Sequence, residues 1–224
     1  NMQMLTNGGE NAEAYFSFDG SKIIFQSTGE YECDQIFIMN TDGSGKHLVS
    51  TGKGRTTCSY FYPDGKNILY DIFKANTDGS NPVKLTDVKG YDAEATISPK
   101  GDKIIFTSTR NGDIDLYSMN LDGSDVKQLT NIAGYDGGAY YSYDGTMIVF
   151  RASRFDDPAK LKEYQDLLAQ GLIRPGMLEI YVMNADGSNI RQVTSNGAAN
   201  FGPYFLPDNK RIIYCSNQAD PKGR

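Results

Sequence analysis

The sequence predicts an all-β protein, specifically a β-propeller made of four-stranded antiparallel blades. Five segments resembling "AEAYFSFDGSKIIF" alternate with four resembling "QIFIMNTDGSGKHLV", so the chain contains an internal repeat. Four short strands in each repeat of ~44 residues are typical of a propeller blade. The 15 Tyr and 11 Phe also favour strands, because flat side chains pack well on a pleated surface. A β-sandwich is the alternative, but sandwiches do not repeat their turn sequences at a fixed period.

The first half of each repeat reads as two strands joined by a turn that resembles Pro-Asp-Gly. Proline presets the first φ of the turn, aspartate bonds the following backbone, and glycine accepts the positive φ. The second half reads as two strands joined by Asn-x-Asp-Gly-Ser, for which the same turn chemistry applies. The last residues of the first type of turn are Gly20, Gly65, Gly101, Gly145 and Asn209.

The spacing of these turns identifies one long repeat. Gly20 and Gly65 lie 45 residues apart and Gly101 and Gly145 lie 44 apart, but 64 residues separate Gly145 from Asn209. The added residues predict a helical insertion over 156–176, with Asp156 or Asp157 as the N-cap, Pro158 in the first turn and Gly171 as the stop. An apolar stripe on this helix is expected to cover a hydrophobic patch of its own domain rather than a partner. It comprises Leu161, Tyr164, Leu167, Leu168 and Leu172.

One repeat is short, since only 36 residues separate Gly65 from Gly101. Its second and third strands meet at Tyr70-Asp71 with no turn residue between them. An antiparallel hairpin needs a loop of about two residues, so we predict that a flexible loop is missing between 70 and 71.

The chain is expected to form a single propeller domain over residues 1–224, incomplete at its C-terminus. Residues 1–6 match the outermost strand of a blade whose other strands do not precede them. We therefore expect this segment to be a closing strand, which would remove a free sheet edge.

Composition excludes several classes of partner. A net charge of -6 argues against nucleic acid and anionic membrane surfaces, which require concentrated Lys and Arg. No apolar run approaches the ~20 residues that span a bilayer. Cys33, Cys58 and Cys215 have no zinc-binding spacing, which leaves one disulfide with a free thiol or three buried thiols.

The search for catalytic motifs is negative. His47 is the only histidine and aligns with solvent-facing positions of other repeats, so neither a catalytic base nor a multi-histidine metal site is expected. There is no G-x-S-x-G element and no complete phosphate-binding loop. The Asn-x-Asp-Gly-Ser loops lack the further carboxylates that calcium needs. We expect no enzyme activity, metal or cofactor.

The candidate site is the rim formed by the loops that lead into each innermost strand. One interpretation is that its small polar residues cap the strand starts and bond local backbone. The other is a polar and aromatic rim that receives a peptide or protein loop. The aligned positions hold Asn11, Thr56, Asp92, Asp136 and Asn200, preceded by Glu10, Arg55, Tyr91, Tyr135 and Ala199, with Glu13 and Glu94 two residues further in.

With these motifs the chain resembles the TolB-type family of periplasmic propellers and, more loosely, the propeller domains of prolyl-oligopeptidase-like peptidases. The stretch "GYDAEATISPKGDKIIFTSTRNGDIDLYSMNLDGSDVKQLT" at 90–130 carries the resemblance. It implies a six-bladed propeller, hence roughly one further blade beyond Arg224. The helical insertion and the short repeat depart from the family pattern, so we expect a TolB-like relative rather than the Tol-system component.

Three functions are consistent with these residues. The first is a non-enzymatic scaffold of the bacterial envelope, periplasmic or extracellular, that binds a protein or peptide at the rim. The second is the regulatory propeller of a larger serine hydrolase or peptidase. The third is a propeller that binds a carbohydrate or another small ligand through Tyr91, Tyr135 and the rim carboxylates.

Overall fold

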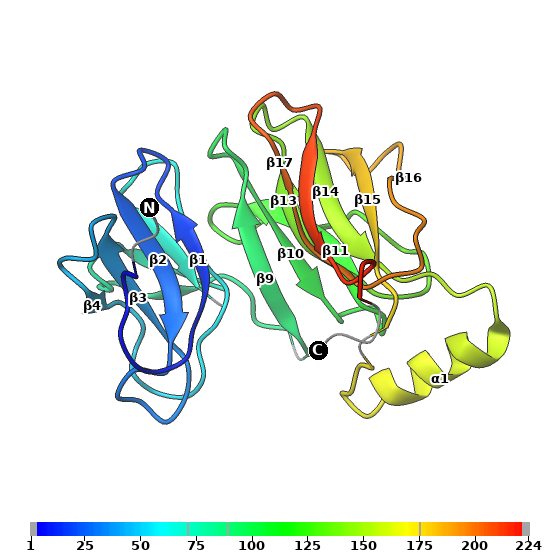
Figure 1. Ribbon diagram of the computed structural model, residues 1–224, viewed down its shortest axis with the longest axis horizontal. Coiled ribbons are helices and arrows are strands. Elements are labelled where there is room, and N and C mark those ends of the chain that lie inside the picture. Colours follow the sequence, from blue (N-terminus) through cyan, green and yellow to red (C-terminus); the bar gives the residue numbers. More distant parts are fainter. Residues whose placement is uncertain (1–3, 71, 89, 175, 221–224) are drawn as a thin grey trace. The chain divides into compact units, whose positions relative to one another are not determined.

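Short antiparallel strands make up nearly all the regular structure, which confirms the predicted β-propeller class (Figure 1). The structure is a computed structural model that describes residues 4–70, 72–88, 90–174 and 176–220. The chain divides into two compact units, one comprising Asn1–Asp87 with Ala93–Ile97 and the other comprising Val88–Asp92 with Ser98–Arg224.

The first unit contains two four-stranded blades, each with its strands in sequence order. A buried cluster that includes Ile24, Ile36, Phe61 and Ile68 packs the two sheets against each other. The first blade has β1 (Asn11–Phe16), β2 (Lys22–Ser27), β3 (Gln35–Asn40) and β4 (His47–Leu48). The second has β5 (Ser59–Phe61), β6 (Asn67–Tyr70), β7 (Phe73–Asn76) and β8 (Val83–Lys84).

The third and fourth sheets are also four-stranded, and two strands of a fifth follow. In the second unit a buried cluster joins neighbouring blades through Ile105, Leu116, Ile148 and Phe150. The third blade has β9 (Asp92–Ile97), β10 (Lys103–Ser108), β11 (Asp115–Asn120) and β12 (Lys127–Gln128). The fourth has β13 (Asp136–Tyr141), β14 (Met147–Ala152), β15 (Glu179–Asn184) and β16 (Arg191–Gln192), and the fifth has β17 (Asn200–Phe205) and β18 (Ile212–Ser216).

The repeated turns have the predicted chemistry. In the first Asn-x-Asp-Gly-Ser turn, the Asn40 side-chain amide donates to Ser44 Oγ at 3.0 Å, and the Ser44 hydroxyl donates to Asp42 Oδ1 at 2.6 Å. The hydroxyl of Ser44 lowers the pKa of Asp42. The same amide-to-hydroxyl bond recurs in the other three turns. Turn geometry therefore accounts for the repetition of this motif.

Gly79 lies in the equivalent turn of the second blade, and its backbone approaches the first blade closely. Its φ is +81°, and an added Cβ would lie 2.6 Å from the Val49 carbonyl oxygen. Gly65, at φ +64°, has no atom within 4 Å of an added Cβ.

Gly79→Ala is therefore expected to lower the free energy of unfolding by about 2 to 5 kcal/mol, since left-handed strain and overpacking add. The matched variant Gly65→Ala carries only the strain, about 1 to 2 kcal/mol. Urea denaturation of both variants tests the difference. Equal losses would show that contact with Val49 is unimportant.

In the short second blade, the second and third strands, β6 and β7, form a short hairpin. Tyr70 pairs with Phe73, and β7 has four residues where the third strands of the other complete blades have six. Asp71 lies outside the described residues, so the predicted missing loop at Tyr70-Asp71 stays a prediction. The predicted closing strand over 1–6 also lies partly outside them, and residues 4–6 do not form a strand.

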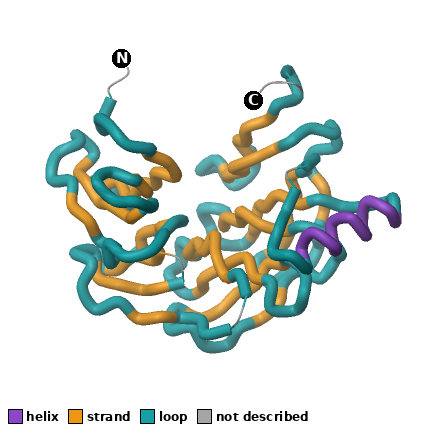
Figure 2. Tube along the Cα trace, turned by 90° about the horizontal axis from the view of Figure 1, so that it is seen from below, coloured by secondary structure: helices purple, strands orange, loops and turns teal. Residues whose placement is uncertain are grey.

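The helical insertion forms α1 (Pro158–Leu168), which lies outside the strands of the fourth blade (Figure 2). Of the two predicted N-cap residues, Asp157 is the N-cap and accepts a hydrogen bond from the Ala159 amide at 2.9 Å, and Pro158 is in the first turn, as predicted. Of the predicted stripe, Tyr164 is buried, whereas Leu172 follows the helix and is 54% exposed. Within the described ranges, no helix has the length and apolar character needed to span a bilayer.

The three cysteines differ from both expected arrangements. All are free thiols, with Cys215 exposed and Cys33 and Cys58 half-buried. Cys58 is on the inner side of the second blade, where burial and the nearby carboxylate of Glu13 raise its pKa to about 12. This thiol is therefore not activated as a nucleophile.

Candidate binding site

The third and fourth blades begin with the same Gly-Tyr-Asp turn, and both turns belong to the second compact unit. The backbone amide of Tyr91 donates to Thr109 Oγ1 at 2.9 Å, and its carbonyl accepts from the Thr109 amide. Tyr135 is held in the same way by Ser153, whose hydroxyl accepts from the Tyr135 amide at 3.1 Å. Both tyrosines are therefore fixed to the end of the adjacent second strand.

Each aspartate of these turns is paired with an arginine that also follows the second strand. Arg110 Nη2 lies 3.2 Å from Asp92 Oδ2, and Arg154 Nη2 lies 2.6 Å from Asp136 Oδ1. The Asp92 side chain is 10% exposed and the Asp136 side chain is fully buried. These two predicted rim residues therefore hold the turn in place and do not present a carboxylate to solvent, whereas Tyr91 is 48% exposed.

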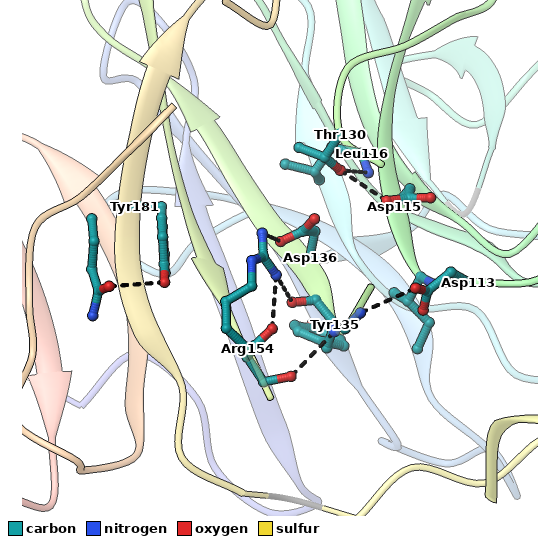
Figure 3. A network of polar contacts seen from close by, with 12 residues as sticks. Asp113, Asp115, Leu116, Thr130, Tyr135, Asp136, Arg154 and Tyr181 are labelled. Carbon is teal, nitrogen blue, oxygen red and sulfur yellow. Dashed lines mark hydrogen bonds and ion pairs between the residues drawn. The ribbon is translucent and has the colours of Figure 1, made fainter. Parts of the chain in front are cut away.

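A buried polar network surrounds Asp136, as Figure 3 shows. The Thr130 hydroxyl donates to Asp115 Oδ1 at 3.2 Å and accepts from the Leu116 amide at 2.9 Å. Burial and the nearby charge of Asp113 raise the pKa of Asp115 to about 6. These groups tie the third strand of the blade to the segment after its fourth strand.

Within this network, the carboxyl group of Asp136 has the most strongly raised pKa. Burial raises its pKa to about 7, although the Arg154 guanidinium acts to lower it. Its second oxygen, Oδ2, is buried and has no hydrogen-bond partner among the described residues. The protonated form is therefore favoured relative to an ordinary aspartate, because an ionised oxygen without a donor is costly to bury.

The Thr130 to Asp115 bond is one instance of a repeated structural feature. In the first blade, the Ser50 hydroxyl donates to Gln35 Oε1 at 2.7 Å and accepts from the Ile36 amide at 2.9 Å. In the fourth, the Thr194 hydroxyl donates to Glu179 Oε2 at 2.5 Å. This recurrence gives Asp115 a structural role in its blade.

A third arginine lies beside Tyr135. Arg151 donates from Nε and Nη2 to the Tyr135 hydroxyl, at 3.2 and 2.9 Å. Its guanidinium lies 5.6 Å from the ring centres of both Tyr135 and Phe201, and the Phe201 side chain is 41% exposed. Gly138, at φ +58°, leaves room for it, because an added Cβ would be 2.7 Å from Arg151 Nη1. The Tyr135 ring is thus oriented by a cation and bordered by a partly exposed aromatic ring.

Asn200, the predicted rim residue of the fifth blade, is fully buried. Its side-chain amide donates to the Leu178 carbonyl at 2.7 Å and to Asn196 Oδ1 at 3.0 Å. It bonds local backbone, which corresponds to the structural interpretation of the rim.

The rim positions of the first unit are more exposed, apart from Thr56, which is buried. Asn11 donates to the Gly8 and Gly9 carbonyls, and Arg55 is 71% exposed beside Asp34. Glu13 lies at a positive φ of 48° within an irregular stretch of β1. Cys58, directly before β5, and Glu94, within β9, have the same left-handed conformation. The structure does not bring all the predicted rim residues into one described site: in the second unit's turns Tyr91 is exposed and Tyr135 is half-buried.

The predicted site omits the three arginines that organise it, Arg110, Arg151 and Arg154. A sequence signal was available for two of them, since Thr109-Arg110 and Ser153-Arg154 directly follow the second strand in the two repeats that carry Gly-Tyr-Asp. Arg151 has no such repeated signal. As predicted, His47 is exposed, and its Nδ1 lies 2.9 Å from the Gly45 carbonyl. In the part of the chain that the structure describes, no group of three or more His, Cys, Asp or Glu residues is arranged to hold a metal ion.

The fold is that of a β-propeller, and TolB proteins are among the solved structures to which it is similar. A candidate TolB from Agrobacterium tumefaciens superposes with a TM-score of 0.65 and 23% identity, over 79% of this chain and 62% of that one. TolB from Acinetobacter baumannii gives a TM-score of 0.73 and 19% identity, over 91% of this chain and 48% of that one. The chain thus covers less than two thirds of each of these proteins, and the likeness establishes the fold.

Enzymes share this fold too. An oligogalacturonate lyase in complex with manganese matches with a TM-score of 0.61 and 14% identity, over 93% of this chain and 58% of that one. A prolyl endopeptidase matches with a TM-score of 0.58 and 11% identity, over 95% and 33%. An uncharacterised protein from Agrobacterium fabrum is 30% identical over 81 residues, 33% of this chain and 28% of that protein. No family model matches the sequence.

Proposed function

We propose that this chain is a non-enzymatic binding propeller of the bacterial envelope, which receives a segment of a partner protein at the inner-strand starts of its third and fourth blades. One observation carries the proposal. Two consecutive blades present a tyrosine from the same Gly-Tyr-Asp turn, while the aspartate is paired with a half-buried arginine. Rigidly held tyrosines are effective protein-binding groups, because they offer a large contact area and lose little conformational entropy on binding.

The buried aspartate and the more accessible aromatic residues of these turns support binding rather than catalysis. Asp136 is fully buried against Arg154, so it is inaccessible to a substrate. Tyr91 is 48% exposed and Phe201 is 41% exposed. The accessible groups are therefore aromatic, and the titratable groups serve to position them. The envelope location rests on the likeness to TolB, whose fold this chain shares.

The double variant Tyr91→Ala/Tyr135→Ala is expected to weaken capture of a partner by about thirty-fold, the effect of losing about 2 kcal/mol of contact energy. The immobilised protein would be incubated with an envelope extract, and bound proteins identified by mass spectrometry. Tyr143→Ala is the control, because Tyr143 is 51% exposed but lies in the turn at the other end of β13. Equal capture by all three proteins would overturn the proposal.

The same variants distinguish the carbohydrate-binding alternative. A glycan array probed with the wild-type protein would yield hits that depend on Tyr91 and Tyr135 if the aromatic groups bind sugars. Glycan hits of this kind, together with no protein partner in the capture experiment, would replace the proposal with a carbohydrate-binding function.

A further inference from the structure

The inserted helix α1 contacts the third blade through its buried side chain, Tyr164. Tyr164 is 8% exposed, and its ring packs 5.2 Å from the ring centre of Phe155. The Tyr164 hydroxyl donates to Asp113 Oδ1 at 2.6 Å. Burial and this bond to Asp113 raise the pKa of Tyr164, so its hydroxyl remains a hydrogen-bond donor at neutral pH. The attachment of the helix therefore includes one charge-assisted hydrogen bond.

The carboxylate that accepts this bond also holds the turn that carries Tyr135. Asp113 Oδ2 accepts from the Gly134 amide at 3.0 Å, and Oδ1 also accepts from the Ile114 amide at 2.8 Å. Figure 3 shows Asp113 next to the Tyr135 turn. The Gly134 backbone packs closely against Ser153, since a Cβ there would clash with the Ser153 carbonyl oxygen. One carboxylate thus links α1 to the Gly134 to Asp136 turn.

A second link runs through the first residues of the insertion. Ser153 accepts from the Tyr135 amide, and Arg154 donates to the Ser153 carbonyl at 2.7 Å while pairing with Asp136. The segment that leads into the helix, Ser153 and Arg154, therefore also binds the turn that carries Tyr135. Movement of the insertion would be transmitted to Tyr135 through both contacts.

We propose that α1 is a latch on the Gly134 to Asp136 turn, so that docking of Tyr164 on Asp113 holds Tyr135 in its binding orientation and undocking of the helix releases it. The coupling follows from the shared carboxylate: without Tyr164, Asp113 loses one of the partners that fix its rotamer, and its hold on the Gly134 amide weakens. A partner that binds the insertion would then regulate the site at Tyr135. The effect on binding rests on the proposed function, but the mechanical coupling does not.

Hydrogen exchange tests the coupling directly. Tyr164→Phe removes only the hydroxyl, and we expect the amides of Gly134, Tyr135 and Asp136 to exchange roughly ten-fold faster, as for loss of a hydrogen bond to a charged group. Tyr181→Phe is the control, because its hydroxyl donates to Gln192 Oε1 at 3.1 Å within the same blade. This control is expected to leave the turn unchanged.

Two outcomes would overturn the latch. In the first, Tyr164→Phe leaves exchange in the turn unchanged, whether or not exchange in α1 rises. In the second, exchange rises uniformly across the unit, the β10–β11 hairpin included, which would indicate a loss of global stability. In partner capture we expect Tyr164→Phe to weaken binding several-fold while Tyr181→Phe does not. Failure of the wild-type protein to capture any partner would reject the proposed function but leave the exchange result standing.

Discussion

Replacing Arg154 by methionine is expected to lower the free energy of unfolding by about 3 to 5 kcal/mol at pH 8, because Asp136 is then a buried carboxylate without a counter-charge. The loss should be smaller at pH 5, where Asp136 takes up a proton and no longer requires the guanidinium. A residual loss is expected at both pH values, since Arg154 also packs over the Tyr181 ring, 5.2 Å from its centre. Urea denaturation at the two pH values measures both effects.

Lys162→Met provides the control for this prediction. Lys162 forms an ion pair with Asp166 at 2.8 Å, but the two side chains are 74% and 59% exposed. Exposed pairs of this kind contribute little, so stability should be nearly unchanged. Two results would contradict the prediction. Arg154→Met could lower the free energy of unfolding no more than Lys162→Met does, or it could lower it equally at pH 5 and pH 8. Either result would show that the guanidinium of Arg154 is not needed to stabilise the buried carboxylate of Asp136.

The stability of the protein itself should fall as the pH rises from 5 to 8. Asp136 has a pKa of about 7 in the folded chain, above the ordinary value of an unfolded aspartate, so the folded state binds the proton more tightly. The resulting stability is fully present below the unfolded pKa and is lost as the pH rises through about 7. The expected loss between pH 5 and 8 is about 2 to 3 kcal/mol from this group.

Asp136→Asn should remove this part of the pH dependence, because asparagine resembles the protonated carboxyl and does not titrate. The free energy of unfolding would be measured by urea denaturation from pH 5 to 8 for the wild type and the variant. Asp92→Asn is the matched control, since both oxygens of Asp92 accept hydrogen bonds from Arg110 Nη2. Parallel curves for the wild type and Asp136→Asn would contradict the assignment of the titration to Asp136.

The strands and turns were predictable from the sequence because their causes are local. Each Asp-Gly turn contains the residues that its own backbone conformation requires, and the Ser44 hydroxyl reaches Asp42 within the same turn. The helix was predictable for the same reason, since Asp157 and Pro158 act within its first turn. Repetition then strengthened these local signals, because the same turn sequences recur at a fixed spacing.

The start of the third strand in the short second blade could not be predicted from local residues. Its strand pattern begins directly after Tyr70, but the described hairpin pairs Tyr70 with Phe73, so its third strand starts later than the alignment of repeats suggests. The first residue of β7 is determined by its pairing with β6. This pairing depends on the position of the partner strand rather than on the residue types in β7.

The candidate site was only partly predictable. The alignment of repeats correctly identified the inner-strand starts of four blades, although β5 starts at Ser59 and not at Thr56, and it named Tyr91, Asp92, Tyr135 and Asp136. It did not distinguish the exposed tyrosine from the buried aspartate, because exposure depends on which arginine folds back over the turn. Arg154 is 18 residues from Asp136, and only the antiparallel pairing of β13 with β14 brings them within hydrogen-bond distance.

By itself, the sequence determined the propeller class, the turn chemistry, the inserted helix and most of the positions at which the inner strands begin, since these depend on residues that are near neighbours or that repeat. The tertiary structure alone decided that Asp136 is fully buried, that Arg151 orients Tyr135, and that Tyr164 reaches Asp113 across 51 residues of chain. Contacts of this kind depend on burial and on the packing of distant segments, and no local pattern of residues encodes them.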